Sequence, residues 1–234
     1  METAQYQTTQ TQVQVNTFVR SVYNWMAIGL GLTGLVAYYV ATSEPLLKII
    51  FGNQLLFFGL IIGELAMVFY LSARINRLQP TTATGLFLFY AFLNGVTLSA
   101  IFLVYSRASI ASTFFICAAT FAASSAFGWV TKRDLTGMGN FLFMGLIGII
   151  IASVVNMFMQ SSGMSMIISY IGVIVFVGLT AYDTQKIKAM ALSQPADIGA
   201  GVVRKGAILG ALSLYLYYIN LSHMMLRIFG SGRD

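Results

Sequence analysis

GAILGALSLYLYYINLSHMMLRIF, residues 206–229, is the stretch that decides the fold. It is apolar enough to enter a lipid bilayer, yet it carries the polar side chains of Ser213, Tyr215, Tyr217, Tyr218, Asn220, Ser222 and His223. A helix with so many polar groups cannot face lipid on all sides, because a polar group in hydrocarbon needs a hydrogen-bond partner. The segment therefore predicts a membrane-spanning helix that other helices enclose.

The composition of the whole chain places it in a membrane. Of its 234 residues, 58% are hydrophobic and 9% are charged, whereas about 25% are charged in a typical soluble domain. A helix needs about 20 mostly apolar residues to cross a bilayer. Seven segments meet this requirement, at 24–42, 55–73, 84–105, 109–130, 138–159, 165–182 and 206–229. We predict an all-α integral membrane protein with seven spans.

The first 17 residues, METAQYQTTQTQVQVNT, differ in composition from the rest. They have neither a basic start nor an apolar run, so they do not resemble a secretory signal peptide. Their Gln- and Thr-rich composition is typical of a disordered tail. We expect a tail at 1–17 and a membrane domain at 18–234.

The lysines and arginines predict the orientation of the chain. With the N-terminus inside, nine of them lie on the inner face and four on the outer face. The inner set is Arg20, Arg74, Arg77, Lys132, Arg133, Lys186, Lys188, Arg204 and Lys205, and the outer set is Lys48, Arg107, Arg227 and Arg233. The positive-inside rule therefore predicts a cytoplasmic N-terminus. The same rule explains the net charge of +6 without nucleic-acid binding. Whether the last span crosses fully or re-enters stays open.

Small residues recur at the spacing of helix contacts. Gly59 and Gly63 form one pair, and Gly206 and Gly210 form another. Side chains this small let two helices approach closely in lipid. We interpret them as packing positions.

Glu64 lies near the middle of the second span, in LLFFGLIIGELAMVFYLSA. An unpaired carboxylate at the bilayer midplane is costly, so this group should be protonated, paired or in contact with water. It is a candidate for an ion pathway. The alternative is a neutral acid that makes one hydrogen bond between helices.

Asp183 ends the sixth predicted span, close to Lys186. On the seventh span, Ser213, Tyr217 and Asn220 are spaced four and three residues apart, so they share one helical face. Met224 and Arg227 continue that face toward the outer end. Such a stripe is what a water-lined path or a buried hydrogen-bond network requires, although tyrosine and serine can also simply join helices.

Two further residues are candidates on position. His223, the single histidine, lies on the outer half of the last span, and we interpret it as a buried, hydrogen-bonded imidazole rather than a metal ligand. Arg74 ends the second span at the inner boundary, where it could form an ion pair with Asp183 as the latch of an inner gate.

Motifs of enzymes are missing from the sequence. There is no HExxH, no Gly-x-Ser-x-Gly and no cluster of cysteine and histidine. We therefore expect neither catalysis nor a bound cofactor or metal.

The chain resembles the Bax inhibitor-1 family, also called the transmembrane Bax-inhibitor-motif family, and its short loops are similar to the bacterial branch. The resemblance covers everything after about residue 18 and is carried by YIGVIVFVGLTAYDTQKIK (170–188), AILGALSLYLYYINL (207–221), LRIFG (226–230), NGVTLSAIFLVY (94–105) and TKRDLTGMGNFLFMGLIGIIIASVVN (131–156). It implies six helices around a central seventh and, for a bacterial chain, the inner membrane.

The resemblance also implies a function. Family members are linked to a pH-sensitive calcium leak, gated by an acid that ends the sixth helix, a second acid on the seventh and an arginine on the second helix. These roles would fall on Asp183, Tyr217 and Arg74. The family pattern LYLDFINL reads LYLYYINL here, so a phenol stands where the second acid is expected. A phenol does not ionise at neutral pH, and we expect pH gating to be altered. Alternatively, the resemblance implies an interaction protein that modulates a membrane protease or a stress or cell-death response.

Overall fold

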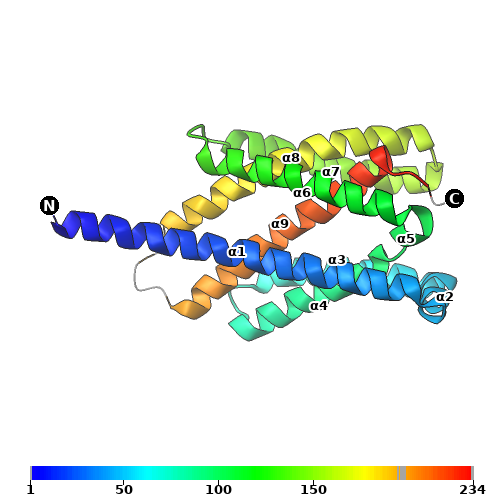
Figure 1. Cartoon of the computed structure of the whole chain (residues 1–234), viewed down its shortest axis with the longest axis horizontal. Helices are drawn as coiled ribbons and strands as arrows, with labels where there is room; N and C mark the ends of the chain where they lie inside the picture. Colours follow the sequence, from blue (N-terminus) through cyan, green and yellow to red (C-terminus); the bar gives the residue numbers. More distant parts are fainter. Residues whose placement is uncertain (1, 194, 196–198, 233–234) are drawn as a thin grey trace. The chain divides into compact units, whose positions relative to one another are not determined.

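The computed structural model describes residues 2–193, 195 and 199–232, with side chains from residue 15 onward. The regular structure in this part of the chain is helical, apart from one isolated bridge between Tyr105 and Gly232 (Figure 1). The helices are α1 (Glu2–Thr42), α2 (Glu44–Gly52), α3 (Gln54–Arg74), α4 (Pro80–Leu98), α5 (Ile101–Val104), α6 (Arg107–Val130), α7 (Thr136–Met159), α8 (Ser162–Leu192) and α9 (Ala200–Phe229). Seven stretches are long and apolar enough to cross a membrane, as predicted.

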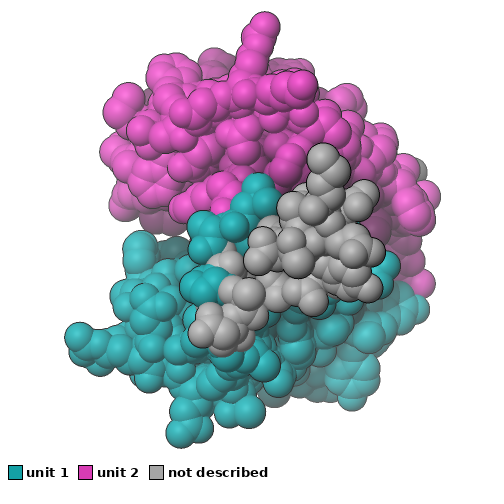
Figure 2. All heavy atoms as spheres, turned by 90° about the vertical axis from the view of Figure 1, so that its left-hand side faces the viewer, with its two compact units in different colours: residues 1–104, 191–215 teal, residues 105–190, 216–234 magenta. Residues whose placement is uncertain are grey.

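The chain forms two compact units (Figure 2). Unit 1 contains residues 1–104 and 191–215, and unit 2 contains residues 105–190 and 216–234. The first half of α9 therefore belongs to unit 1 and its second half to unit 2. The helix that the sequence analysis singles out contributes to the packing of both units.

The N-terminal helix begins earlier than expected. α1 starts at Glu2, so residues 2–17 are helical where the sequence analysis expects a disordered tail. The segment contains neither proline nor glycine, the two residues that interrupt helices most strongly. Val15, Phe18 and Val22 are buried, which gives the helix a packed face before the predicted span at 24–42 begins.

The sixth span ends later than expected. α8 continues past Asp183 to Leu192, so Asp183 lies within a helix and not at its end. Ile187 and Ala191 are both buried and follow Asp183 at steps of four residues, so one packed face extends through this turn. The side chain of Gln185 holds the extension to the α6–α7 connection: it accepts from the backbone of Leu135 at 2.9 Å and donates to the carbonyl of Arg133 at 2.8 Å.

The third span is interrupted near its end. α4 stops at Leu98 and α5 resumes at Ile101. The hydroxyl of Ser99 donates to the carbonyl of Val96 at 2.7 Å, and Ser99 is fully buried. A serine bonded to its own backbone in this way competes with the helical hydrogen-bond pattern. The short helix α2, which begins with Glu44 and Pro45, was not expected.

Unit 1 is built around the contact of α1 with α4. Thr33 of α1 donates to the carbonyl of Ala91 on α4 at 2.8 Å, and its oxygen lies 2.6 Å from the hydroxyl of Tyr215 on α9. The ring of Tyr215 packs edge-on against Phe87 and Tyr90, each with a centroid distance of 5.8 Å. Tyr215 is completely buried, so it joins three helices of this unit.

Unit 2 depends on close approaches between α6, α7 and α8, which lie side by side in Figure 1. Gly128 of α6 sits against the backbone of Ala181 on α8, and Gly139 of α7 sits against the ring of Tyr182. From α9, the hydroxyl of Tyr218 donates to the carbonyl of Phe114 on α6 at 3.0 Å. Glycine at the first two positions lets the helices touch, which is the usual device in lipid.

The glycine pair predicted in the second span has a different outcome. A methyl group added at Gly59 or at Gly63 would meet nothing within 4 Å, so neither residue mediates a helix contact in the described part of the chain. Gly95 of α4, in contrast, lies at a helix contact, because a methyl group added there would lie 2.7 Å from the carbonyl oxygen of Thr33 on α1. The spacing of small residues alone does not say which face of a helix is covered.

We predict that Gly128→Ala lowers stability by about 1–3 kcal/mol, the usual cost of overpacking, because the added methyl group collides with the backbone of Ala181. Thermal unfolding of the purified protein in detergent measures the effect. Gly148→Ala is the matched control, since nothing lies within 4 Å of its added methyl group. Equal melting temperatures for the two variants would contradict the proposed contact.

Candidate functional site

The acid and the phenol that the sequence analysis pairs lie in direct contact. The hydroxyl of Tyr217 on α9 donates to the carboxylate Oδ2 of Asp183 on α8 at 3.0 Å. Asp183 is buried, at 8% exposure, and the ring of Tyr217 leans against Phe176 with a centroid distance of 6.2 Å. A neutral donor thus meets the carboxyl group at the position where a second acid is expected from the family pattern.

The helix turns around this pair are held by polar contacts within unit 2. The hydroxyl of Thr184 donates to the hydroxyl of Ser125 on α6 at 3.4 Å. The ammonium of Lys188 donates to the carbonyl of Trp129 at 2.7 Å and lies 5.0 Å from the centre of its indole ring. These bonds join α8 to α6 in the first two turns after Asp183, so they hold the part of α8 that follows this residue.

A basic pocket of about 360 Å³ lies beside this region. Its lining includes Lys132, Arg133 and Lys186, with Asp134 as the acid among the described residues that line it. Asp134 lies outside the spans. Hydrogen bonds from the side chain and then the backbone N–H of Thr136 hold the pKa of its carboxyl group below the usual value. The basic residues outnumber the acid in this pocket, so its lining is positively charged. The pocket lies at the end of unit 2 for which the positive-inside rule predicts a cytoplasmic location.

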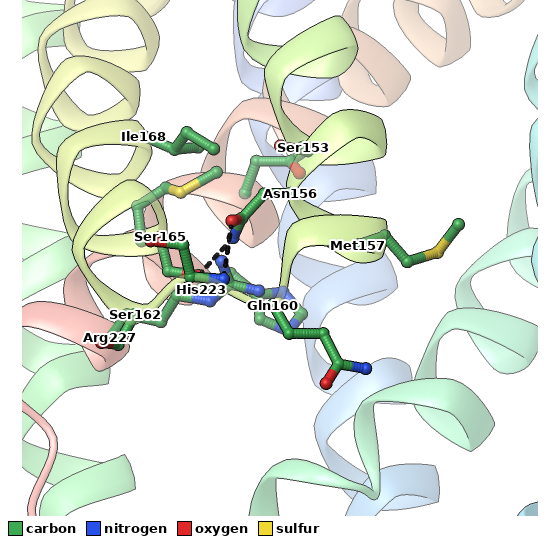
Figure 3. A pocket seen from close by; sticks show the side chains of 12 residues that line it. Ser153, Asn156, Met157, Gln160, Ser162, Ser165, Ile168, His223 and Arg227 are labelled. Carbon is green, nitrogen blue, oxygen red and sulfur yellow. Dashed lines mark hydrogen bonds between the residues drawn. The ribbon is translucent and has the colours of Figure 1, made fainter.

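A larger polar cavity, of about 550 Å³, lies between α7, α8 and α9 (Figure 3). Asn220, Met224 and Arg227 line it, as does His223. Asn220, Met224 and Arg227 of the predicted stripe therefore border one cavity. Asn220 follows Tyr217 by three residues, which is about 4.5 Å along the helix axis.

The wall of this cavity is a hydrogen-bonded network from α7 and α8. The amide of Asn156 donates to the hydroxyl of Ser165 at 2.7 Å, and the two side chains point toward each other in Figure 3. The amide oxygen of Asn156 accepts from the backbone of Ser161 at 3.1 Å. Asn156 is buried, so its polar atoms shape the wall and hold the start of α8 in place.

His223, predicted as a buried and hydrogen-bonded imidazole, is half-buried and lines the cavity between α9 and the helices α7 and α8. Its hydrogen bond stays a prediction. Asn220 differs, because its amide donates to the carbonyl of Leu216 one turn earlier at 2.8 Å.

Glu64 has neutral partners in unit 1. Its carboxylate accepts from the hydroxyl of Thr97 at 2.9 Å and from the amide of Asn94 at 3.5 Å, both on α4. Asn94 is buried and Glu64 is partly buried. The hydrogen bond between helices that the alternative interpretation of Glu64 requires is therefore present. It joins α3 to α4 and satisfies the acid without a basic partner among these contacts.

Two predicted site residues do not join these clusters. Ser213 is half-buried on the part of α9 that belongs to unit 1, and Arg74 is the exposed last residue of α3 in the same unit. A latch formed by Arg74 with Asp183, which belongs to unit 2, stays a prediction.

The sequence analysis did not identify several residues that form hydrogen bonds between helices. Thr33 is the partner of Tyr215, and Asn156 with Ser165 forms the cavity wall. Asn156 could have been found, because an asparagine within the apolar run 138–159 needs a partner for its amide. Thr33 gives no such signal, because a threonine in a helix can bond to its own backbone.

These features define a class: a seven-span, all-helical membrane protein whose last helix carries internal hydrogen bonds and lines a polar cavity. The model of the family described as "Inhibitor of apoptosis-promoting Bax1" matches residues 15–234. The chain belongs to this family, as its motifs indicate.

Relatives match along almost the whole chain. The inner membrane protein YbhL of Escherichia coli is 51% identical over 224 residues, which cover 96% of this chain and 95% of the relative. A protein of Borreliella burgdorferi is 43% identical, with 94% of each chain covered. A membrane protein of Streptococcus pyogenes is 39% identical, with 95% of this chain and 96% of the relative covered.

We predict that Tyr217→Phe lowers stability by about 1–3 kcal/mol, because the carboxyl group of Asp183 loses a buried donor while the packing of the ring is kept. Thermal unfolding in detergent reports the change. Tyr170→Phe on α8 removes the same hydroxyl from a side chain that is 54% exposed, and it should leave the melting temperature unchanged. If both variants behave like the parent, the contact does not stabilise unit 2.

For Glu64 we expect a difference between two substitutions. Glu64→Gln keeps an acceptor for Thr97 and Asn94 and should cost less than about 1 kcal/mol, whereas Glu64→Ala leaves the buried amide of Asn94 without this acceptor and should cost about 1–3 kcal/mol. Glu44→Ala serves as the control, since its surface ion pair with Lys48, at 3.8 Å, is worth less than about 1 kcal/mol. Equal stability of the Gln and Ala variants would show that these hydrogen bonds contribute nothing.

Proposed function

We propose that the protein forms a leak pathway for calcium or another cation, with its gate at the contact between Asp183 and Tyr217. The observation that carries this proposal is the 3.0 Å hydrogen bond between the two side chains, on the polar face of the last helix. A carboxyl group inside a membrane bundle is costly and commonly marks an ion or proton pathway.

Three features of the described residues support the proposal. The polar cavity extends to Asn220, which lies one helical turn from Tyr217, so there is room for water close to the proposed gate. The hydrogen bonds of Thr184 and Lys188 to α6 hold the helix that carries Asp183. Glu64, bonded to α4, is a further polar site for the pathway, and the latch role of Arg74 belongs to the same proposal.

The phenol changes how such a gate responds to pH. Two nearby carboxyl groups titrate as a coupled pair: they share a proton when closed and repel each other once both are ionised. Tyr217 stays neutral and keeps donating across the physiological range. The gate of this chain should therefore open less with rising pH than a gate with two acids.

We predict that Tyr217→Asp raises calcium flux in proteoliposomes several-fold and makes it increase with pH, because ionisation of both acids then separates α8 from α9. Asp183→Asn should lower the flux, because it keeps an acceptor for Tyr217 but removes the charge that attracts a cation. The measurement is the signal of a calcium indicator inside the vesicles at several pH values.

The controls are vesicles without protein and Tyr170→Phe, which changes an exposed tyrosine of α8 and should match the parent. If the parent, Tyr217→Asp and Asp183→Asn show the same calcium flux at every pH, the proposal that these two residues form a gate is wrong.

A second candidate function rests on the start of α1. Residues 2–14 continue this helix ahead of the span, which begins at Val15, and the polar segment would be the element that a membrane protease or a protein of a stress or cell-death response recognises. Deletion of residues 2–14 separates the two functions: loss of control over a partner with unchanged flux favours the interaction protein. The name of the Escherichia coli relative supports a place in the inner membrane.

A further inference from the structure

We propose that the cavity between α7, α8 and α9 is a binding site for an oxyanion, either a small soluble phosphate or carboxylate or the phosphate of a lipid headgroup. The cavity has a volume of about 550 Å³, within the range of about 300–1,000 Å³ that is typical of ligand sites. The binding claim does not require the proposed cation leak, although the same cavity also borders Asn220, one turn from the proposed gate.

The charge of the lining selects the ligand. Arg227 supplies a permanent positive charge, and His223 lies one turn before it on the same face of α9. Among the described residues that line the cavity none is acidic, and Arg227 forms no salt bridge with any described residue. A divalent cation would be repelled here, whereas an anion would pair with the arginine. Guanidinium binds carboxylate and phosphate groups through two parallel hydrogen bonds.

The remaining polar groups suit the same ligand. Gln160, Ser161 and Ser162 line the same cavity as Arg227 and His223. All three side chains can donate hydrogen bonds to an oxygen atom. The site therefore offers one charged donor and several neutral donors to a single bound group.

The conformation of Gln160 points in the same direction. Gln160 lies at the turn between α7 and α8 and has a backbone φ of 50°. Among the described residues it is the non-glycine residue with a positive φ. Such a conformation costs a side chain roughly 1–2 kcal/mol that glycine would avoid. Glycine would serve the turn better, so the strain is explained if the amide is needed in the cavity.

The wall of the cavity is held by hydrogen bonds within the protein. Asn156 holds both Ser165 and the backbone of Ser161, and Ser161 caps the backbone of Met164 at 3.3 Å. The donors at the start of α8 are thus positioned by protein contacts and do not need to reorganise, which favours affinity.

The test compares binding of inorganic phosphate and of phosphatidylglycerol to the parent and to Arg227→Gln. Phosphate is titrated at constant ionic strength against chloride in zwitterionic detergent, with the rise in melting temperature as the readout. Because phosphate stabilises most proteins weakly by exclusion from their surface, the quantity that counts is the difference between variants. Retention of phosphatidylglycerol is measured by native mass spectrometry.

We expect Arg227→Gln to bind about tenfold more weakly, the loss of roughly one charge-assisted hydrogen bond, while Arg227→Lys binds better than Arg227→Gln. Arg77→Gln, an equal charge change at an exposed arginine of unit 1 after α3, should bind like the parent. Gln160→Gly should keep or raise the melting temperature without ligand, since it relieves strain, yet weaken binding.

The outcomes separate the sources of the anion. Arg227-dependent stabilisation by phosphate identifies a soluble anion, and Arg227-dependent retention of phosphatidylglycerol without a phosphate effect identifies a lipid headgroup. If neither probe distinguishes Arg227→Gln from Arg77→Gln, the cavity is not an anion site. Calcium flux is not read in this experiment, so its result stands whether or not the leak exists.

Discussion

The polar side chains of α9 must find partners inside the protein, and the rest of the packing depends on this constraint. Tyr215, Tyr217 and Tyr218 are close in sequence but point in different directions, since each residue turns a helix by about 100°. Tyr215 meets Thr33 of α1, Tyr217 meets Asp183 of α8, and Tyr218 meets the carbonyl of Phe114 on α6. One apolar helix with three hydroxyl groups thus requires neighbours on several sides.

Glycine contacts make these hydrogen bonds geometrically possible. In unit 2 the backbones of α6 and α8 touch at Gly128 and Ala181, which brings Ser125 within reach of Thr184 and places Asp183 in a packed interior. In unit 1 the approach of Gly95 to Thr33 plays the same part for α4 and α1. Close packing and polar pairing are therefore one arrangement, because in lipid there is little hydrophobic force to hold helices together otherwise.

The second half of α9 has two chemically different regions on one face. At Tyr217 it offers a neutral donor to an acid, and from Asn220 to Arg227 it borders a cavity with a positive lining. A cation that entered through the cavity would first meet Arg227, and an anion bound there would reduce that repulsion. The two proposals of gate and anion site are separate, but their charges suggest a physical route by which one could influence the other.

The number of spans and the contact of Asp183 with a phenol could be predicted from residue order. Hydrophobic length decides what crosses a bilayer, and the family motifs indicate which residue of the last span faces Asp183. The ends of α1 and α8 could not be predicted, because buried faces at Val15 and Ile187 extend these helices beyond their apolar runs.

Only the tertiary structure shows the cavity and the position of His223 in its lining. It alone shows too that no atom lies close to Gly59 or Gly63. Residue type states what a side chain can bind or permit, but only the packed neighbours determine whether protein, lipid or empty space lies beside it.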